Sequence, residues 1–431
     1  MEKYTESYQK ASCCFEDLEG KKDFEILKNM PNFKYLIQNG SYSSNVESVY
    51  PSLTYPAHAT IVTGNYPKNH GIINNTLLQP KMKNPDWFWY RKYIKGTTLY
   101  DLAKENGLKT ASLLWPVTAK ANIDYNMPEI FPNRIWQNQI STSLSGGSKL
   151  FQFIVNKKFG KLRKGFAQPF LDNFVMKSAL YLIENKMPNL LLIHLTDVDH
   201  FKHNYGCNSS KVLEALKRHD LRLGKIINIL KKINIFPKTT IIALGDHSFL
   251  NTEYVIRLNK LFLQKGFISL NNNGEVKDWK VFSNSCSGSA YIYLKDNKDS
   301  ILKAKVMEEL KNFSKENNCI NKILTSKEAS SFGADEKCFL MLEAKKGYYF
   351  INSIEGNILE KTDKSFYKAN HGYCPKIKDY KTIFIASGPK IKKNYEIKEM
   401  RLIDEAPTIA KTLDLNLGKV DGATLKEIFL A

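Results

Sequence analysis

Short, continuous runs of apolar residues recur along the chain, and stretches with helical periodicity separate them. The clearest strand candidates are residues 110–115 (TASLLW), 190–196 (LLLIHLT), 239–244 (TTIIAL) and 382–387 (TIFIAS). The helix candidates are residues 97–106, 174–186, 209–232 and 299–313. Strands that are apolar at nearly every position are typical of a parallel sheet covered on both faces, so this alternation predicts an α/β fold.

Two regions depart from this alternation. Residues 270–365 contain SGSAYIYLKD, a Lys/Glu-rich helical stretch and KCFLMLEAKKGYYFINS, which together predict a small α+β insertion. Residues 80–175 carry most of the tryptophans and few clear strands, and we interpret them partly as an accessory region over the active site. The predicted core then consists of residues 1–269 and 366–431.

The composition narrows the classes of function. Hydrophobic residues make up 43% of the 431 residues, which is enough for a large buried core. The formal net charge of +20 favours anionic ligands such as phosphorylated compounds. Because the lysines are scattered and not massed in one tail or stripe, we expect no stable nucleic-acid partner.

The cysteines and the hydropathy of the chain indicate in which cellular compartment the protein is expected. The seven cysteines are dispersed and form no CxxC pair, which argues against a cysteine-based zinc site and is typical of reduced thiols. No segment approaches the ~20 apolar residues of a membrane span. The N-terminus lacks the apolar region of a signal peptide. We therefore expect a cytoplasmic protein with no membrane span.

Acidic residues and histidines follow two of the predicted strands. In HLTDVDHFKH, Asp199 and His203 are four residues apart, so one helical turn places both on the same face. Asp197 and His200 are neighbours that could take the same role. A carboxylate and an imidazole on one face suit a zinc-like cation.

A second pair follows the strand TTIIAL. In ALGDHS, Asp246 and His247 lie in the loop at the carboxyl end of the strand, where ligands bind in α/β sheets. There the two side chains can converge on one ion, although Asp246 could instead cap a helix. His371, in ANHGY, is a further candidate, although a lone His-Gly also occurs freely in turns.

Thr54 is the candidate nucleophile. In VYPSLTYPAHAT it precedes Pro56 and a run of small and apolar residues, which predicts a helix start. A hydroxyl at a helix N-terminus faces the positive end of the helix dipole, where a phosphate binds. A nearby metal ion can activate such a hydroxyl. The alternative interpretation is that Thr54 is an N-cap residue.

Taken in order, these segments resemble a known family. TYPAHATIVTGNYPKNHGIINN, DHFKH, GDH and NHGY are similar to the motifs of the nucleotide pyrophosphatase/phosphodiesterase family, within the alkaline-phosphatase superfamily. The similarity extends from about Asp17 to IDEAPTIAKTLDL. It implies an alkaline-phosphatase-like fold, with a mostly parallel central sheet and helices on both faces.

The resemblance also implies two divalent metal ions, zinc first and manganese as the alternative. One site would consist of Asp199, His203 and His371. The other would consist of Asp17, Thr54, Asp246 and His247. The segment before Asp17, YQKASCCFE, is not the strongly apolar strand that the family has there, and Glu16 and Asp23 are alternatives to Asp17.

The remaining roles follow from the same resemblance. Thr54 would form a phosphothreonine intermediate, and Asn75 would hold a phosphate oxygen, with Asn74 as a close rival. Tyr55 stands where the family packs an aromatic ring on the nucleotide base. The implied substrate is a small, nucleotide-like phosphodiester or pyrophosphate. Ser248 replaces the glycine that usually follows the GDH motif.

Other functions remain in competition. Sulfatases resemble Cys-x-Pro-x-Arg at the nucleophile, and Thr-Tyr-Pro-Ala-His argues against that class. A phosphonate or phosphate monoester hydrolase would keep the same sheet and much of the metal set, and a non-catalytic binding protein would leave one metal site empty. The aromatic segment DWFWYRKY, with Trp115 and Trp136, could form a wall for a nucleobase, but we favour packing against the sheet.

Overall fold

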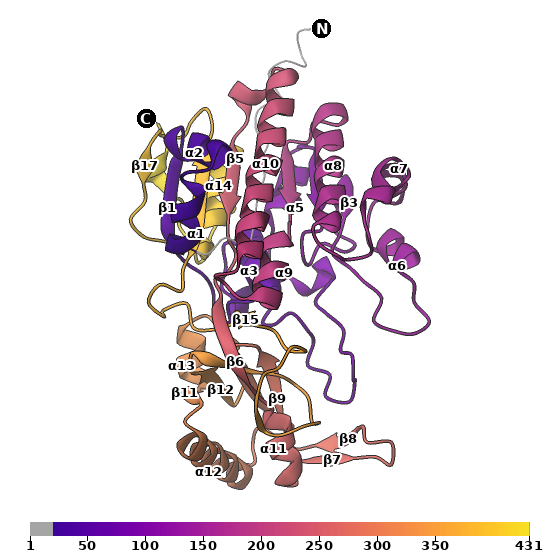
Figure 1. Ribbon diagram of the computed structural model, residues 1–431, viewed down its shortest axis with the longest axis vertical. Coiled ribbons are helices and arrows are strands. Elements are labelled where there is room, and N and C mark those ends of the chain that lie inside the picture. Colours follow the sequence, from indigo (N-terminus) through magenta and orange to yellow (C-terminus); the bar gives the residue numbers. More distant parts are fainter. Residues whose placement is uncertain (1–19, 431) are drawn as a thin grey trace.

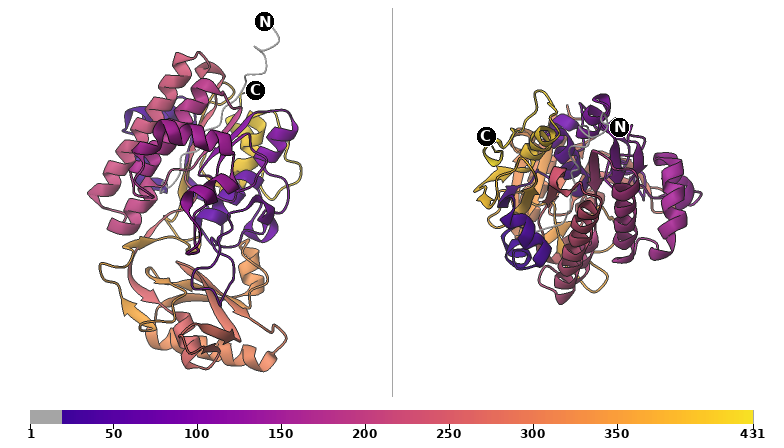
Figure 2. Two further views of the ribbon diagram at one scale, coloured as in Figure 1. Left: turned by 90° about the vertical axis from the view of Figure 1, so that its right-hand side faces the viewer. Right: turned by 90° about the horizontal axis from the view of Figure 1, so that it is seen from above.

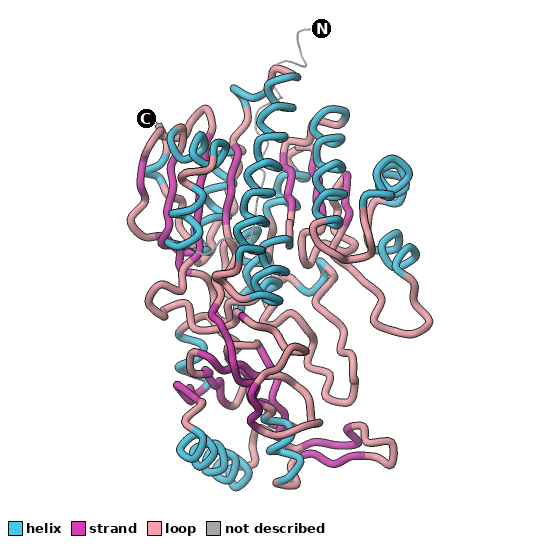
Figure 3. The backbone as a smooth tube through the Cα atoms, in the orientation of Figure 1, coloured by secondary structure: helices cyan, strands magenta, loops and turns pink. Residues whose placement is uncertain are grey.

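A computed structural model describes residues 20–430 of the chain, so Asp17 and Glu16 lie outside the described residues. Figure 1 shows an upper part built of sheets and long helices, and a lower part that is richer in strands. Figure 3 shows the same division by element type. The predicted strands and helices are the framework of the upper part.

The largest sheet of the upper part has the strand order β17-β1-β16-β5, with β18 also paired to β1. Its strands are β1 (Ser41–Glu47), β5 (Ile241–Leu244), β16 (Thr382–Ser387), β17 (Tyr395–Glu396) and β18 (Met400–Arg401). β16 is antiparallel to both β1 and β5. The chain leaves this sheet at the carboxyl end of β5, passes through the lower part and re-enters the sheet at that same end. β16 is therefore antiparallel to β5.

A second sheet beside it is fully parallel, with the order β3-β2-β4. Its strands are β2 (Thr110–Leu113), β3 (Tyr125–Met127) and β4 (Leu190–Ile193). All four predicted strands are therefore present, and the α/β class is confirmed. The sheet containing β16 is mixed, whereas the sequence predicted mostly parallel strands.

The strands are apolar throughout because both faces of the sheets are buried. In β5, Ile241 and Ala243 join one core cluster, while Ile242 and Leu244 join another on the opposite face. The first cluster is covered by α1 (Gly20–Leu27), α2 (Pro31–Gln38), α8 (Phe170–Asn185) and α10 (Ser210–Lys232). The second is covered by α3 (Thr54–Thr63), α5 (Leu99–Glu105) and α14 (Glu405–Thr412). Figure 2 shows these helical layers from the side and from above.

The lower part holds an antiparallel sheet of order β11-β12-β10-β9 with α12 (Ser300–Asn317) near it. Its strands are β9 (Val281–Cys286), β10 (Ser289–Leu294), β11 (Ile320–Thr325) and β12 (Leu340–Ala344). The other helices here are α11 (Leu258–Gln264) and α13 (Ser326–Ser331), and the hairpin consists of β7 (Ile268–Leu270) and β8 (Val276–Trp279). The division of the chain at residues 270 and 365 stays a prediction.

A further sheet joins the lower part to the region of the site. β6 (Leu250–Ile256) pairs with β13 (Gly347–Phe350), β14 (Leu359–Lys361) and β15 (Ala369–Asn370). Residues before position 270 therefore share a sheet with residues inside the 270–365 range. The pairing of β15 with the start of β6 fixes the segment that carries His371.

The accessory region includes α6 (Gln139–Gly146), α7 (Lys149–Phe159) and the short helix η3 (Gly160–Leu162), which lie at the right edge of Figure 1. Packing is confirmed for Trp89 and Trp115, which are 5% and 0% exposed. It is wrong for Trp136, which is 77% exposed. No helix among residues 20–430 is both long and apolar enough to cross a membrane.

A buried ion network anchors α9 (Asp197–Tyr205) to α8 and α10. Arg222 donates to Asp197 at 2.7 Å, and Asp172 lies 3.3 Å from the same guanidinium nitrogen. Arg218 adds hydrogen bonds of 2.7 and 2.8 Å to the two oxygens of Asp197. The Asp172 carboxylate also accepts from the backbone N–H groups of Thr196 and Asp197, so it fixes the first turn of α9.

We expect Arg222→Met to lower the free energy of unfolding by about 3–5 kcal/mol, because it leaves two buried carboxylates without their shared cation. Urea unfolding followed by circular dichroism measures the change. Lys232→Met is the matched control, since Lys232 is 69% exposed and pairs only with Glu184, which should cost under about 1 kcal/mol. Equal losses in the two variants would contradict the role given to the network.

Candidate active site

The predicted site residues converge below the carboxyl ends of β4 and β5. α9 begins shortly after β4, the Asp246–His247 pair follows β5, and His371 follows β15. Four segments that are far apart in the sequence, including the start of α3, therefore meet at one place. This is the position at which ligands bind in α/β sheets.

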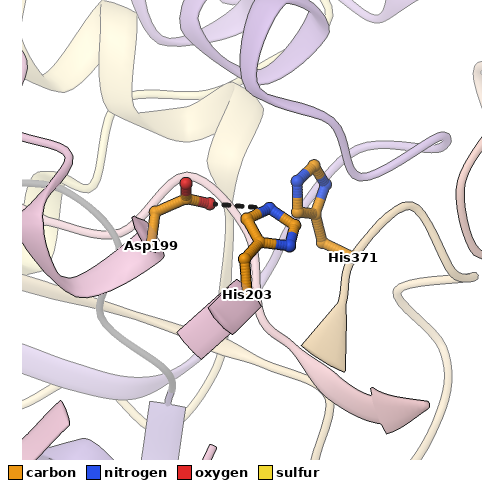
Figure 4. Close-up of side chains that lie close together, drawn as sticks. All are labelled: Asp199, His203 and His371. Carbon is orange, nitrogen blue, oxygen red and sulfur yellow. Dashed lines mark ion pairs between the residues drawn. The ribbon is translucent and has the colours of Figure 1, made fainter. Parts of the chain in front are cut away.

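The first cluster consists of Asp199, His203 and His371, whose potential ligand atoms all lie within 4.8 Å of one another. Figure 4 shows the Asp199 carboxylate directed at the His203 ring, with His371 beside it. The His203 Nε2 to Asp199 Oδ1 distance is 3.3 Å. The four-residue spacing on α9 thus places Asp199 and His203 together as predicted, and the pairing of β15 with β6 brings His371 beside them.

Backbone carbonyls orient both imidazoles of this cluster. The Nδ1 atom of His203 is 2.8 Å from the Ala369 carbonyl, and Nδ1 of His371 is 3.2 Å from the Ser52 carbonyl. A proton held on Nδ1 by a carbonyl leaves the lone pair of Nε2 for a metal, the usual arrangement of metal-binding histidines.

The protonation states also fit a cation. Burial, followed by the charge of His203, lowers the pKa of His371 to about 3. Burial opposes ionisation of Asp199, but its interactions with His203, His371 and His194 together lower the pKa of Asp199 to about 2. A neutral imidazole and an ionised carboxylate are the forms that bind zinc, so the protonation states of His371 and Asp199 fit a zinc site.

The second cluster consists of Thr54, Asp246 and His247. Nε2 of His247 lies 3.1 Å from Asp246 Oδ2 and 3.2 Å from the Thr54 hydroxyl. His247 is fully buried, and its Nδ1 atom has no hydrogen-bond partner among residues 20–430. Burial, then the charges of His371 and His203, lower the pKa of His247 well below its ordinary value. Asp17, the expected fourth ligand, lies outside the described residues.

The two clusters adjoin through their imidazoles. The rings of His247 and His371 stack with centroids 3.8 Å apart and planes at 13°. Two neutral rings tolerate this contact, whereas two imidazolium rings would repel each other. The arrangement therefore places two sets of metal-type ligands side by side around Thr54.

Thr54 is the first residue of α3, and Leu53 is the N-cap. The Thr54 hydroxyl contacts His247 and does not cap the helix, so the N-cap interpretation is wrong. The hydroxyl thus stands at the positive end of a ten-residue helix and beside two potential metal ligands.

The rival candidates from the sequence are engaged elsewhere. Asp197 is held by Arg218 and Arg222, as described above. His200, next to Asp199, contacts Asn204 on its own helix. The Asp23 carboxylate pairs with the buried Lys202 at 2.8 Å. None of these three is brought into the cluster of Asp199, His203 and His371.

The two asparagines have different environments. Asn74 is 2% exposed and donates to the Ser285 carbonyl at 3.0 Å. Asn75 is partly exposed, and its Oδ1 accepts from the Tyr55 backbone N–H at 3.0 Å. Its Nδ2 group makes no hydrogen bond to protein within residues 20–430, so it can donate to a ligand. This geometry favours Asn75 over Asn74 as the phosphate ligand.

Tyr55 is 0% exposed. Its ring packs edge-on against Trp87 at 5.1 Å, and its hydroxyl lies 3.4 Å from Glu129. In this structure its ring has no face open to a nucleotide base, and the base-stacking role that the resemblance implies stays a prediction.

His58 is a residue of the site that the sequence reasoning missed. It lies one helical turn after Thr54, and its Nδ1 atom is 2.7 Å from the Thr54 carbonyl and 3.6 Å from Asp246 Oδ2. Burial, followed by the charge of His194, lowers the pKa of His58 to about 3. The four-residue spacing in TYPAH was the available signal, because it places His58 on the same helix face as the nucleophile.

A glycine is required beside His371. Gly372 has φ +86°, and a Cβ atom there would lie 1.8 Å from the Cys286 carbonyl. The Gly372 N–H donates to the Ser52 carbonyl at 2.9 Å, the same carbonyl that contacts Nδ1 of His371. The His-Gly sequence therefore joins the His371 loop tightly to the segment before Thr54.

Comparisons with known proteins agree with this geometry. A family model described as type I phosphodiesterase / nucleotide pyrophosphatase matches residues 21–374. Ectonucleotide pyrophosphatase/phosphodiesterase family member 1 of Homo sapiens is 29% identical over 266 residues, which are 58% of this chain and 24% of the human protein. Venom phosphodiesterase 2 of Crotalus adamanteus is 27% identical over 229 residues, which are 51% of this chain and 24% of the venom protein. The chain spans about a quarter of the length of these relatives.

Solved structures show the same fold. Murine ectonucleotide pyrophosphatase/phosphodiesterase 5, in an inactive form in complex with AMP, gives a TM-score of 0.67 at 19% identity, over 98% of this chain and 100% of that chain. Its human counterpart gives the same TM-score at 18% identity, with the same coverage. These similarities confirm the alkaline-phosphatase-like arrangement predicted from the sequence.

We expect Asp199→Asn to lower zinc affinity by more than ~100-fold, beyond the usual loss for an outer-shell partner, because a charged ligand becomes neutral. Isothermal titration of the metal-free protein measures this. His200→Ala is the matched control, since His200 neighbours Asp199 on α9 but lies outside the cluster, and it should bind zinc like the wild type. Full affinity in Asp199→Asn, or equal losses in both variants, would remove Asp199 from the metal site.

Proposed function

Because the chain belongs to the type I phosphodiesterase / nucleotide pyrophosphatase family, we propose that it hydrolyses phosphodiester or pyrophosphate bonds in nucleotide-like substrates. The observation that carries this proposal is the position of the Thr54 hydroxyl. It stands at the start of α3, 3.2 Å from His247, beside two clusters of carboxylates and imidazoles. Such a hydroxyl is an activated nucleophile for phosphoryl transfer.

The residues are proposed to hold two divalent metal ions, zinc first and manganese as the alternative. Asp199, His203 and His371 would hold one ion, and Asp246, His247, Thr54 and Asp17 the other. When bound, such ions neutralise phosphate charge and lower the pKa of a coordinated hydroxyl, so no separate general base is required. His58, which contacts Asp246, would keep that carboxylate in position.

The reaction would proceed in two displacements at phosphorus. The Thr54 oxygen attacks in line and forms a phosphothreonine ester, while the bond to the leaving alcohol or phosphate breaks and that group departs with its electron pair. Water then attacks the phosphothreonine, and Thr54 leaves and regains its proton. The α3 N-terminus and the Asn75 Nδ2 group would bind the equatorial phosphate oxygens, which carry the negative charge of the transition state.

Hydrolysis of diesters is preferred over hydrolysis of monoesters for an electrostatic reason. A monoester carries a third charged oxygen, which requires a further cation near the nucleophile. Lys202 lies on α9 with the metal ligands, but it is 0% exposed and pairs with Asp23.

The nucleotide-like substrate class is supported by a solved relative that was determined with AMP. A cytoplasmic location and the absence of a stable nucleic-acid partner remain part of the proposal.

Thr54→Ala should reduce turnover of a phosphodiester by at least ~10³-fold, because covalent catalysis by the nucleophile is lost. Thr54→Ser is the matched control: it keeps a hydroxyl and should retain measurable turnover. Zinc content, measured on the same preparations, should stay close to the wild-type value in both. Acid quenching with a phosphorus-labelled substrate should trap label on the wild type but not on Thr54→Ala. Wild-type turnover in Thr54→Ala would refute the assignment.

The substrate class can be tested with two nitrophenyl esters. We expect bis-nitrophenyl phosphate to be hydrolysed with a higher kcat/KM than the mononitrophenyl ester, since residues 20–430 place no further free cation beside Thr54 for a dianion. Removal of metal with a chelator should abolish both activities, and added zinc should restore them. A preference for the monoester would favour the phosphatase alternative. No activity in a protein that binds zinc stoichiometrically would favour the non-catalytic alternative.

A further inference from the structure

The accessory region carries an unusual charge distribution. Between Glu129 and Asp172 the sequence contains no acidic residue. The same segment contains seven cationic side chains: Arg134, Lys149, Lys157, Lys158, Lys161, Arg163 and Lys164. A scattered surplus of lysine would be interrupted by Asp and Glu, which are 43 in number over the whole chain. This segment therefore creates a local region of positive electrostatic potential within a generally basic protein.

The same segment exposes large apolar side chains. Ile135 is 99% exposed, Trp136 77% and Leu150 73%. Ile140, Phe153 and Phe166 are 59–66% exposed. Exposed apolar residues are ordinary when they occur singly, but a concentration of them in one region indicates an interaction surface. We call the exposed apolar and cationic side chains of residues 134–166 the apolar-basic face.

The geometry of α7 shows how the two kinds of side chain are combined. Leu150, Phe153 and Lys157 are spaced by three and four residues, so they lie along one exposed side of the helix. Phe151 and Val155, on another side, are buried in the core. Exposed apolar residues with lysines at the margin are typical of helices that lie in a membrane interface. Figures 1 and 2 show α6 and α7 standing out from the sheets, where a flat partner could reach them.

An apolar cavity of about 750 Å³ lies behind this face. Ile140, Phe153 and Phe166 line it and are also exposed, so the cavity borders the face. Its inner end reaches Leu114, Met127 and His194, close to the carboxyl ends of β2, β3 and β4. The volume is typical of sites that hold small apolar molecules, and it gives a lipid chain a recess outside the bilayer.

We propose that the apolar-basic face docks on the surface of an anionic phospholipid bilayer. Such a surface attracts the cations at a distance and accepts the aromatic and aliphatic side chains in its interfacial layer. A soluble polyanion would pair with the cationic side chains of this face but would leave its apolar side chains exposed to water. A second copy of the chain would bring two sets of cations together without any acidic residue to pair them, so self-association through this face is opposed by repulsion. The proposal is independent of the reaction assigned to Thr54.

Sedimentation with lipid vesicles tests the proposal. The wild type should bind vesicles of phosphatidylcholine with phosphatidylglycerol, and it should bind pure phosphatidylcholine vesicles much more weakly. Added salt should weaken the binding, since it screens the cations. Each lysine near an anionic surface contributes about fivefold to affinity, so Lys149→Glu/Lys157→Glu/Lys161→Glu should lower it by on the order of 100-fold.

The matched control is Lys298→Glu/Lys311→Glu/Lys315→Glu, which makes the same change in net charge at exposed positions on or beside α12. It should lose little of the binding. Trp136→Ser/Leu150→Ser tests the apolar contribution and should weaken binding even at low salt. Hydrolysis of the soluble bis-nitrophenyl ester should be unchanged in all three variants, which separates loss of docking from loss of the fold or of catalysis.

Several outcomes would overturn the proposal. They are equal binding to zwitterionic and anionic vesicles, equal losses in the α7 and α12 variants, or no vesicle binding by the wild type. A wild-type dimer in sedimentation velocity that the α7 variant converts to a monomer, without vesicle binding, would assign the face to self-association. A wild type that binds anionic vesicles but does not hydrolyse the soluble ester would refute the proposed reaction and leave docking intact.

Discussion

The shared cation of Arg222 between Asp172 and Asp197 is the interaction on which the site depends. Each carboxylate is fully buried, and only charge-assisted hydrogen bonds make such burial tolerable. The oxygens of Asp172 also fix the first turn of α9 by accepting from two of its backbone N–H groups. Because Asp199 and His203 lie on that helix, their positions are set by a network that contains neither of them, and the ligands need no rearrangement when a cation arrives.

The second constraint is the protonation state of the two stacked imidazoles, His247 and His371. Burial and the charges of neighbouring histidines disfavour the charged forms of His247 and His371, and two imidazolium rings stacked at 3.8 Å would repel each other. In His203 and His371, hydrogen bonds from Nδ1 to backbone carbonyls leave the lone pair on Nε2. The site thus combines ionised carboxylates with two neutral imidazoles, His247 and His371, and these are the forms that bind a divalent cation.

The sequence predicted those parts of the fold and the site that depend on local patterns. Continuous apolar runs identified β4 and β5 because both faces of those strands are buried, and a four-residue spacing placed Asp199 and His203 together. The sequence could not show that β16 is antiparallel, because its direction depends on where the chain re-enters the sheet. The burial of Tyr55 was equally hidden, since it depends on Trp87 and Glu129, which are distant in sequence. His58 was overlooked because its role depends on contact with Asp246, which lies in the loop after β5.

The carbonyl oxygen of Ser52 joins two parts of the site that are more than three hundred residues apart in the sequence. It contacts both His371 and Gly372, and it lies just before the nucleophile. The Ser52 carbonyl therefore ties the loop of His371 directly to the segment that carries Thr54, so the spacing of the two ligand clusters depends on backbone contacts. This spacing favours a substrate whose phosphate oxygens reach both clusters. A substrate that required the clusters to move apart would bind less well, because the contacts of the Ser52 carbonyl would have to be distorted.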